Sequence, residues 1–107
     1  MKYRVVLQQL AIADLDEYYR WAARRAPETA ALWLGRFQAE LESLAANPER
    51  CSPAPENGKL SREIRQLLFG RRPNVYRAVF TIESDVVRVL RIRRAARRFL
   101  TKRELEE

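Results

Sequence analysis

Histidine is absent from the chain, and with it the side chain that most often acts as a general base or a metal ligand near neutral pH. The single cysteine, Cys51, cannot form an internal disulfide and cannot hold a metal ion alone. The three glycines, Gly35, Gly58 and Gly70, are scattered, so they form neither a dinucleotide fingerprint nor a phosphate-binding loop. These absences argue against the usual serine, cysteine and metal hydrolases, and we expect no metal ion and no cofactor.

Long apolar runs are missing as well. No stretch approaches the roughly 18 apolar residues of a membrane-spanning helix, and the N-terminal MKYRVVLQQL lacks the apolar core and cleavage site of a signal peptide. We therefore expect a cytoplasmic protein that does not bind a membrane. Hydrophobic residues make up 47% of the 107 residues and charged residues 33%, a composition that predicts one globular domain over residues 1–107.

Positive charge is concentrated in the second half of the chain. Residues 1–61 carry eight Lys or Arg and eight Asp or Glu, whereas residues 62–103 carry thirteen Lys or Arg and three carboxylates. The last four residues, ELEE, return three negative charges, and the formal net charge is +7. A basic segment of this size attracts polyanions or an acidic protein segment. The alternative is a solvated face that only keeps the protein soluble.

The first half of the chain predicts one strand followed by two helices. MKYRVVL is rich in β-branched and aromatic residues, which indicates a strand that ends near residue 8. A helix is expected over residues 9–25 and a second one from Pro27 to about residue 46, joined as an antiparallel hairpin. Of the two adjacent tyrosines, we assign Tyr19 to the core and leave Tyr18 outside. The core face of the first helix would then contain Ile12, Leu15, Tyr19 and Ala22 or Ala23.

The second half predicts a loop and a meander of three antiparallel strands. Residues 47–60 are rich in proline, and alternating segments follow at residues 62–70, 75–82 and 86–93 with turn signals between them. The fold class is α+β, with the helical hairpin on one face of a four-stranded sheet and arginine on the other face and on a short C-terminal tail. Thr101 and Glu104 have capping-box spacing, which predicts a short final helix. The residues that we assign to the core beneath the helices are Tyr76, Phe80, Leu90 and Ile92.

Four segments carry a resemblance to a known family. ADLDEYYRW, REIRQLLFG, VYRAVFTI and VRVLRIRRAARR, in this order, resemble the RelE/ParE superfamily of bacterial type II toxins, from about residue 3 to residue 100. The resemblance implies a toxin that a cognate antitoxin holds inactive, with a partly disordered part of the antitoxin covering the helices or the sheet. We expect the antitoxin to contact Tyr18 and Arg88.

The superfamily has two main activities. RelE-like members cut mRNA on the ribosome with basic residues and a tyrosine near the C-terminus, whereas ParE-like members bind DNA gyrase, trap its cleaved complex and need no catalytic residues of their own. The last tyrosine here is Tyr76, and neither Phe99 nor Thr101 can replace a phenol. Many relatives have a histidine in the last strand, close to the position of Arg94. The resemblance therefore favours inhibition of gyrase, with ribosome-dependent mRNA cleavage as the alternative.

No catalytic residue can be assigned from the sequence. Arginine stabilises a phosphorane, but it is a poor base because its pKa lies above about 12. Glu63 would be a candidate base if it shared a strand face with Arg65, although an ion pair between the two is the more ordinary expectation. The surface expected to bind the target contains Arg65, Arg77, Arg91, Arg93, Arg94, Arg97 and Arg98.

A third hypothesis is a nucleic-acid-binding module without catalytic activity. The C-terminal arginines would contact phosphates, which gives binding that weakens steeply with salt and has little sequence preference. The C-terminal segment offers only Phe99 for stacking on bases, whereas single-strand binders generally use several aromatic side chains.

Overall fold

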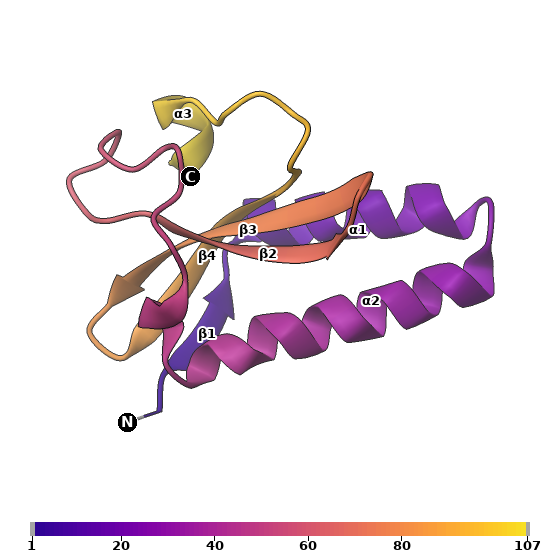
Figure 1. Ribbon diagram of the computed structural model, residues 1–107, viewed down its shortest axis with the longest axis horizontal. Helices are drawn as coiled ribbons and strands as arrows, with labels where there is room; N and C mark the ends of the chain where they lie inside the picture. The colour runs from indigo at the N-terminus through magenta and orange to yellow at the C-terminus, as the bar shows by residue number, and fades with distance from the viewer. Residues whose placement is uncertain (1, 107) are drawn as a thin grey trace.

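A four-stranded sheet with a helical hairpin on one side organises the molecule (Figure 1). The computed structural model describes residues 2–106, and it confirms the α+β fold and the order of the elements. The strands are arranged β1-β4-β3-β2, with β1 parallel to β4 and the other pairs antiparallel. The elements are β1 (Arg4–Leu7), α1 (Gln9–Ala23), α2 (Pro27–Glu42), β2 (Arg65–Arg71), β3 (Asn74–Glu83), β4 (Val86–Arg94) and α3 (Lys102–Leu105).

The predicted bounds agree best where the sequence carries a strong local signal. Pro27 occupies the first turn of α2, where its missing N–H costs no hydrogen bond. The capping box at the start of α3 is also confirmed, since the Thr101 hydroxyl accepts from the Glu104 N–H and the Glu104 carboxylate accepts from the Thr101 N–H. β2 begins three residues later than predicted, and α2 ends at Glu42 in a 3-10 turn. Met1, part of the predicted first strand, lies outside the described residues.

The main core lies between the helices and the sheet. α1 places Leu15 in it as predicted, but the rest of its core face is shifted by one position from the predicted one. Ala11 and Leu15 are buried there and Tyr18 packs against them, whereas Ile12 is 54% exposed. The assignment of Tyr19 rather than Tyr18 to the core was therefore wrong. Both sets of residues have three- and four-residue spacing, so periodicity alone did not distinguish two faces that differ by one position.

A β-bulge in β4 explains why both faces of that strand mix apolar and basic residues. Val79 pairs with Arg91 and Phe80 pairs with Val89, so Leu90 is an extra residue in the ladder. An extra residue reverses the alternation beyond it, and Val89 and Ile92 both reach the core beneath the helices. Tyr76 and Phe80 lie in that core as predicted. Leu90 does not, because the bulge turns it to the opposite face of the sheet.

The opposite face of the sheet is covered rather than open and arginine-rich as predicted. The proline-rich loop and the C-terminal segment fold over it and bury a second apolar cluster. Leu100 is fully buried there and Leu105 is 2% exposed, so the C-terminal segment docks through these two leucines. Figure 1 shows the path of this segment from β4 to α3. The members of this cluster are Ala54, Ile64, Val79, Leu90, Leu100 and Leu105. No helix within residues 2–106 is long and apolar enough to cross a membrane.

Replacing Gly70 at the end of β2 by alanine is expected to destabilise the protein by about 3 kcal/mol or more. Gly70 has a φ of 102°, and a Cβ there would overlap the Asn74 carbonyl oxygen. Gly58 has nearly the same φ, 104°, but nothing lies within 4 Å of its Cβ position. Gly58→Ala should therefore cost only about 1 kcal/mol. Urea unfolding of both variants checks this, and equal losses would contradict the steric argument.

Candidate functional site

Arg77 lies inside the protein, so the prediction that it belongs to an exposed basic surface was wrong. Its side chain is 4% exposed and donates to both carboxylate oxygens of the fully buried Glu56, at 2.9 and 2.5 Å. Glu56 also accepts from the Leu100 N–H at 2.8 Å. Burial alone would raise the pKa of Glu56, but the hydrogen bonds from Arg77 and Leu100 outweigh it and lower the pKa. This pair fastens the proline-rich loop to β3 and to the C-terminal segment.

Arg91 is also held within the fold, by Asp14 of α1. Its guanidinium donates two hydrogen bonds to the Asp14 carboxylate, at 2.7 and 2.9 Å, and that carboxylate also accepts from the Ile92 N–H at 3.0 Å. Two residues further along β4, the Arg94 N–H donates to the Tyr18 hydroxyl at 3.3 Å. β1 pairs with β4 only as far as Val89. After Val89, Asp14 and Tyr18, one helical turn apart on α1, accept the hydrogen bonds of these two N–H groups.

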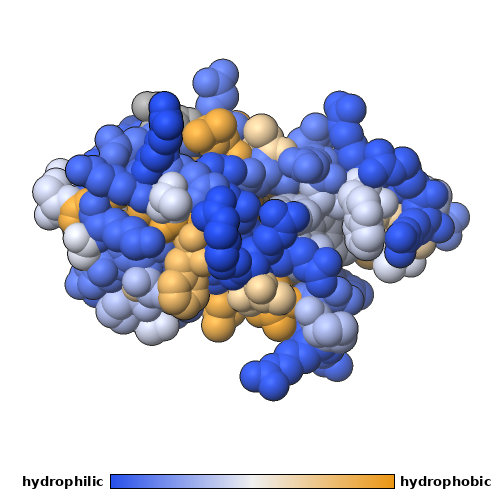
Figure 2. All heavy atoms as spheres, turned by 90° about the horizontal axis from the view of Figure 1, so that it is seen from above, coloured by the Kyte–Doolittle hydropathy of each residue, from blue (hydrophilic) through white to orange (hydrophobic). Residues whose placement is uncertain are grey.

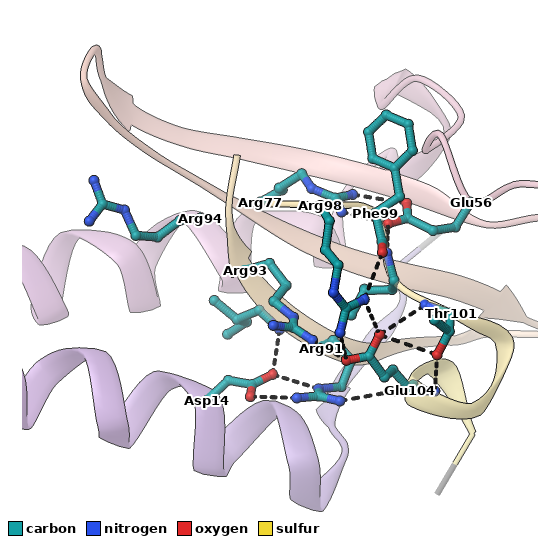
Figure 3. A network of polar contacts seen from close by, with 12 residues as sticks. Asp14, Glu56, Arg77, Arg91, Arg93, Arg94, Arg98, Phe99, Thr101 and Glu104 are labelled. Carbon is teal, nitrogen blue, oxygen red and sulfur yellow. Dashed lines mark hydrogen bonds and ion pairs between the residues drawn. The ribbon is translucent and has the colours of Figure 1, made fainter. Parts of the chain in front are cut away.

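The Glu104 carboxylate binds two more of the predicted site arginines, Arg93 and Arg98 (Figure 3). It accepts from Arg93 at 2.5 Å and from two nitrogens of Arg98 at 2.8 and 2.9 Å. The Thr101 N–H and hydroxyl also donate to it, at 2.9 and 3.2 Å, and the Glu104 backbone carbonyl accepts from Arg91 at 3.2 Å. Hydrogen bonds from Arg98 and the Thr101 N–H hold the pKa of Glu104 well below its usual range.

The expected ion pair between Arg65 and Glu63 is confirmed. The Arg65 Nε donates to the Glu63 carboxylate at 2.9 Å, while Nη1 donates to the carbonyls of Glu49 and Cys51. Arg65 therefore ties β2 to the preceding loop, and its side chain is 18% exposed. The ion pair leaves Glu63 poorly placed to act as a base.

Arg94 and Arg97 differ from the arginines bound to carboxylates. Arg94 donates to the Asn74 side chain at 3.0 Å, and its guanidinium lies 5.9 Å from the centre of the Tyr76 ring. Arg97 is exposed in the segment after β4. Figure 2 views the molecule from the side of α3, where hydrophilic residues cover most of the surface and apolar residues show in small patches.

A groove of about 830 Å³ lies between the helical hairpin and the tip of the β2–β3 hairpin. Its apolar lining includes five aromatic side chains, and Trp21 at its rim is 44% exposed with the Arg25 guanidinium 4.6 Å from the centre of its ring. Basic side chains surround it, and no Asp or Glu is part of the lining within residues 2–106. The aromatic residues are Tyr18, Trp21, Trp33, Phe69 and Tyr76, and the arginines are Arg25, Arg36 and Arg71.

Sequence reasoning missed this groove. A tryptophan on an amphipathic helix is ordinarily a packing residue, and Trp33 does pack against Phe37 and Tyr76. Arg25 and Arg36 lie in the first half of the chain, so the concentration of charge after residue 62 included only Arg71 of the three groove arginines. One signal in the sequence could have indicated the groove. Trp21 and Arg25 are four residues apart, which places them on the same side of a helix and allows a cation–π contact.

The two residues expected to contact the antitoxin lie in different places. Tyr18 lines the groove. Arg88 lies in β4 opposite Val6 of β1 and Thr81 of β3, and it binds Glu83 at 3.1 Å. Arg88 and Arg94, which lies beside Tyr18, are six positions apart, and six positions correspond to about 20 Å of strand. A short segment of a partner therefore does not cover both residues, and contact of the antitoxin with Tyr18 and Arg88 stays a prediction. No cluster of metal-ligating side chains occurs in the part of the chain that the structure describes.

Comparisons with known proteins agree with this architecture. One similar solved structure is the chromosomal ParDE TA system from P. aeruginosa, with a TM-score of 0.70 and 22% identity over 87% of this chain and 96% of that chain. A mutant of E. coli toxin RelE in the free state is more distant, with a TM-score of 0.53 and 16% identity over 90% and 86% of the two chains. At these identities the likeness concerns the fold. No curated protein matches the sequence.

The family assignment comes from the sequence itself. The model of the family described as "ParE toxin of type II toxin-antitoxin system, parDE" matches residues 5–99. The match runs from β1 through the bulged β4 to the segment before α3. The protein belongs to the ParE toxin family of type II toxin–antitoxin systems.

Proposed function

We propose that this protein arrests bacterial growth by inhibiting DNA gyrase in the cytoplasm, and that a cognate antitoxin neutralises it. Membership in the ParE family supports the toxin role. The choice of gyrase over the ribosome rests on one observation, the arginine cluster around Glu104. That cluster offers positive charge together with a carboxylate that already accepts five hydrogen bonds.

Such a cluster suits binding better than RNA cleavage. Cleavage by the 2′-hydroxyl needs a group that takes up its proton. Arginine cannot do so because its guanidinium is already protonated near neutral pH, and Glu104 is a poor base because its pKa is lowered and its oxygens already accept hydrogen bonds. The cluster can therefore stabilise a phosphate without removing a proton. Inhibition of a DNA enzyme by binding requires no more than that.

The groove is the surface that best fits the antitoxin. Its aromatic lining favours apolar side chains of the partner, and its arginines favour carboxylates. Arg94 contributes further positive charge, because it contacts Asn74 and Tyr76 of the lining. An amphipathic helix with acidic residues on its flanks has this chemistry. The partner would thus cover Tyr18 and block access to the arginines nearby.

The proposed target is tested by inducing the chain without a partner and following labelled thymidine and labelled methionine during the first minutes. Incorporation of thymidine should fall first, because gyrase supports replication. Purified protein should also inhibit supercoiling of relaxed plasmid by purified gyrase. An early fall in methionine incorporation with normal supercoiling would instead point to the ribosome and overturn the gyrase proposal.

Two double variants, one test and one matched control, are used in the same experiment. Arg93→Ala with Arg98→Ala removes the two guanidinium groups bound to Glu104, and it should relieve the arrest. Arg20→Ala with Arg24→Ala removes the same charge from the exposed side of α1, and toxicity should persist. Co-expression of the small protein encoded next to the toxin should restore growth of the parent strain.

A further inference from the structure

The contacts of Glu104 resemble those of a bound oxyanion more than those of a surface ion pair. Two guanidinium groups, a backbone N–H and a hydroxyl converge on one carboxylate. An exposed pair normally joins one cation to one anion, as Arg20 and Asp16 do on α1 at 2.9 Å. Convergent arginine donors are the usual means of binding a phosphate.

The cluster can be reached from solvent. The Arg98 side chain is 63% exposed and that of Glu104 is 23% exposed, whereas Arg93 lies deeper at 12%. The buried Nε of Arg93 has no acceptor in the described part of the chain. Glu104 therefore leaves part of this guanidinium unsatisfied, although it binds the Nη2 group. A buried donor without an acceptor in a basic cluster is an independent indication that another anion can bind here.

The surroundings favour a strand of nucleic acid over a small anion. Residues 93–103 hold six Lys or Arg and no Asp or Glu, so positive charge extends along the whole segment on both sides of Arg98. A polymer of phosphates gains from such a row of charges through counterion release. The element that carries Glu104, α3, is a single turn held by its capping box and by Leu105, so the carboxylate can rotate away while the Leu100 anchor stays in place.

We propose that Glu104 is an internal anion that occupies a phosphodiester-binding site formed by Arg93 and Arg98, and that a nucleic acid strand displaces it. In this arrangement the C-terminal turn restrains binding until a strand competes with the carboxylate. The inference rests on the proposed function for its biological role, which is to contact DNA held by gyrase. The binding itself needs no gyrase.

The test measures binding of the full chain to a labelled 20-base-pair DNA duplex and to a 20-nucleotide RNA strand, by fluorescence anisotropy at several salt concentrations. Glu104→Gln keeps the shape of the side chain and removes the competing charge. We expect it to tighten binding about tenfold and to steepen the salt dependence by about one phosphate contact or more. Adding Arg93→Ala to Glu104→Gln should cancel most of the gain.

Glu106→Gln is the matched control, because it makes the same charge change two residues away at an exposed position. Its affinity should stay within about twofold of the parent. Equal affinities of the Glu104 and Glu106 variants for both polymers would overturn the proposal. A gain with DNA, with RNA or with both supports the site and identifies the strand it takes. Because no step involves gyrase, a failure of the gyrase proposal would leave this result unchanged.

Circular dichroism and thermal unfolding establish that each variant is folded. If Glu104→Gln does not fold, Thr101→Ala provides the same test without a change in charge. It removes one hydroxyl from the capping box and weakens the restraint on Glu104. Binding should then tighten about threefold, and an unchanged affinity would contradict the restraint.

Discussion

Glu56→Ala is expected to lower the free energy of unfolding by about 4 kcal/mol. The substitution leaves the Arg77 guanidinium, 4% exposed, without its carboxylate and removes the acceptor of the Leu100 N–H. A buried charge that loses its partner costs much more than the pair contributes when it is intact. Urea unfolding followed by circular dichroism measures the loss. The C-terminal segment should become sensitive to protease at the same time, because Leu100 is one of its anchors.

Two comparisons separate this explanation from a general loss of charge. Glu63→Ala removes a carboxylate that is 56% exposed from its pair with Arg65, and it should cost less than about 1 kcal/mol. Glu56→Gln combined with Arg77→Met keeps an acceptor for Leu100 and removes the buried charge, so it should recover much of the stability. If Glu56→Ala costs no more than Glu63→Ala, the buried pair does not have the role assigned to it.

The effect of Glu56 should also depend on pH in a defined direction. Its pKa in the folded protein lies below the ordinary value of 4.5. A lowered pKa contributes stability that is complete above the unfolded value and is lost as the pH falls through the folded value. The difference between parent and Glu56→Ala should therefore persist from neutral pH to about 4.5 and shrink only in stronger acid.

Asp14→Ala is expected to destabilise the protein by about 3 kcal/mol. One carboxylate supports both the Arg91 guanidinium and the Ile92 N–H, in a setting where the Arg91 and Asp14 side chains are 15% and 13% exposed. Its loss leaves a mostly buried cation and an N–H at a strand edge that β1 does not reach. Hydrogen exchange should become faster at Ile92 in particular, since its N–H loses its acceptor.

Asp16→Ala provides a close control on the same helix. Asp16 pairs with Arg20 in an exposed i,i+4 arrangement, with the Asp16 side chain 53% and the Arg20 side chain 73% exposed. Its removal should cost less than about 0.5 kcal/mol. Similar losses for the two aspartates would show that Asp14 contributes only to the helix and not to the edge of β4.

The sequence alone was sufficient for the fold class because the signals that specify it are local. These signals affect only residues a few positions away in the chain. They are the proline at the start of α2, the turn residues between the strands and the capping box at Thr101. They predicted the order of the elements and most of their bounds. The family resemblance followed from the same order, together with the four segments that carry it.

The candidate site was less accessible because its residues are defined by partners far apart in the chain. From residue type and position in the chain, seven arginines were predicted to form one surface. The fold binds Arg77 to Glu56 and Arg91 to Asp14, which stands 77 positions away. No local pattern identifies such partners, since a carboxylate that pairs with a buried arginine looks like any other in the sequence.

Composition and spacing determined that this is a basic α+β protein with a helical hairpin over a four-stranded sheet, because the apolar periodicities and turn residues are properties of short segments. The tertiary structure alone decided which arginines stay available. A single extra residue at Leu90 reverses the faces of β4, and the folded-back C-terminal segment brings Glu104 against Arg93 and Arg98. The bulge and the Glu104 contacts both depend on residues that are distant in the sequence and meet only in the folded sheet, where the same packing determines which side chains are buried and which charges pair.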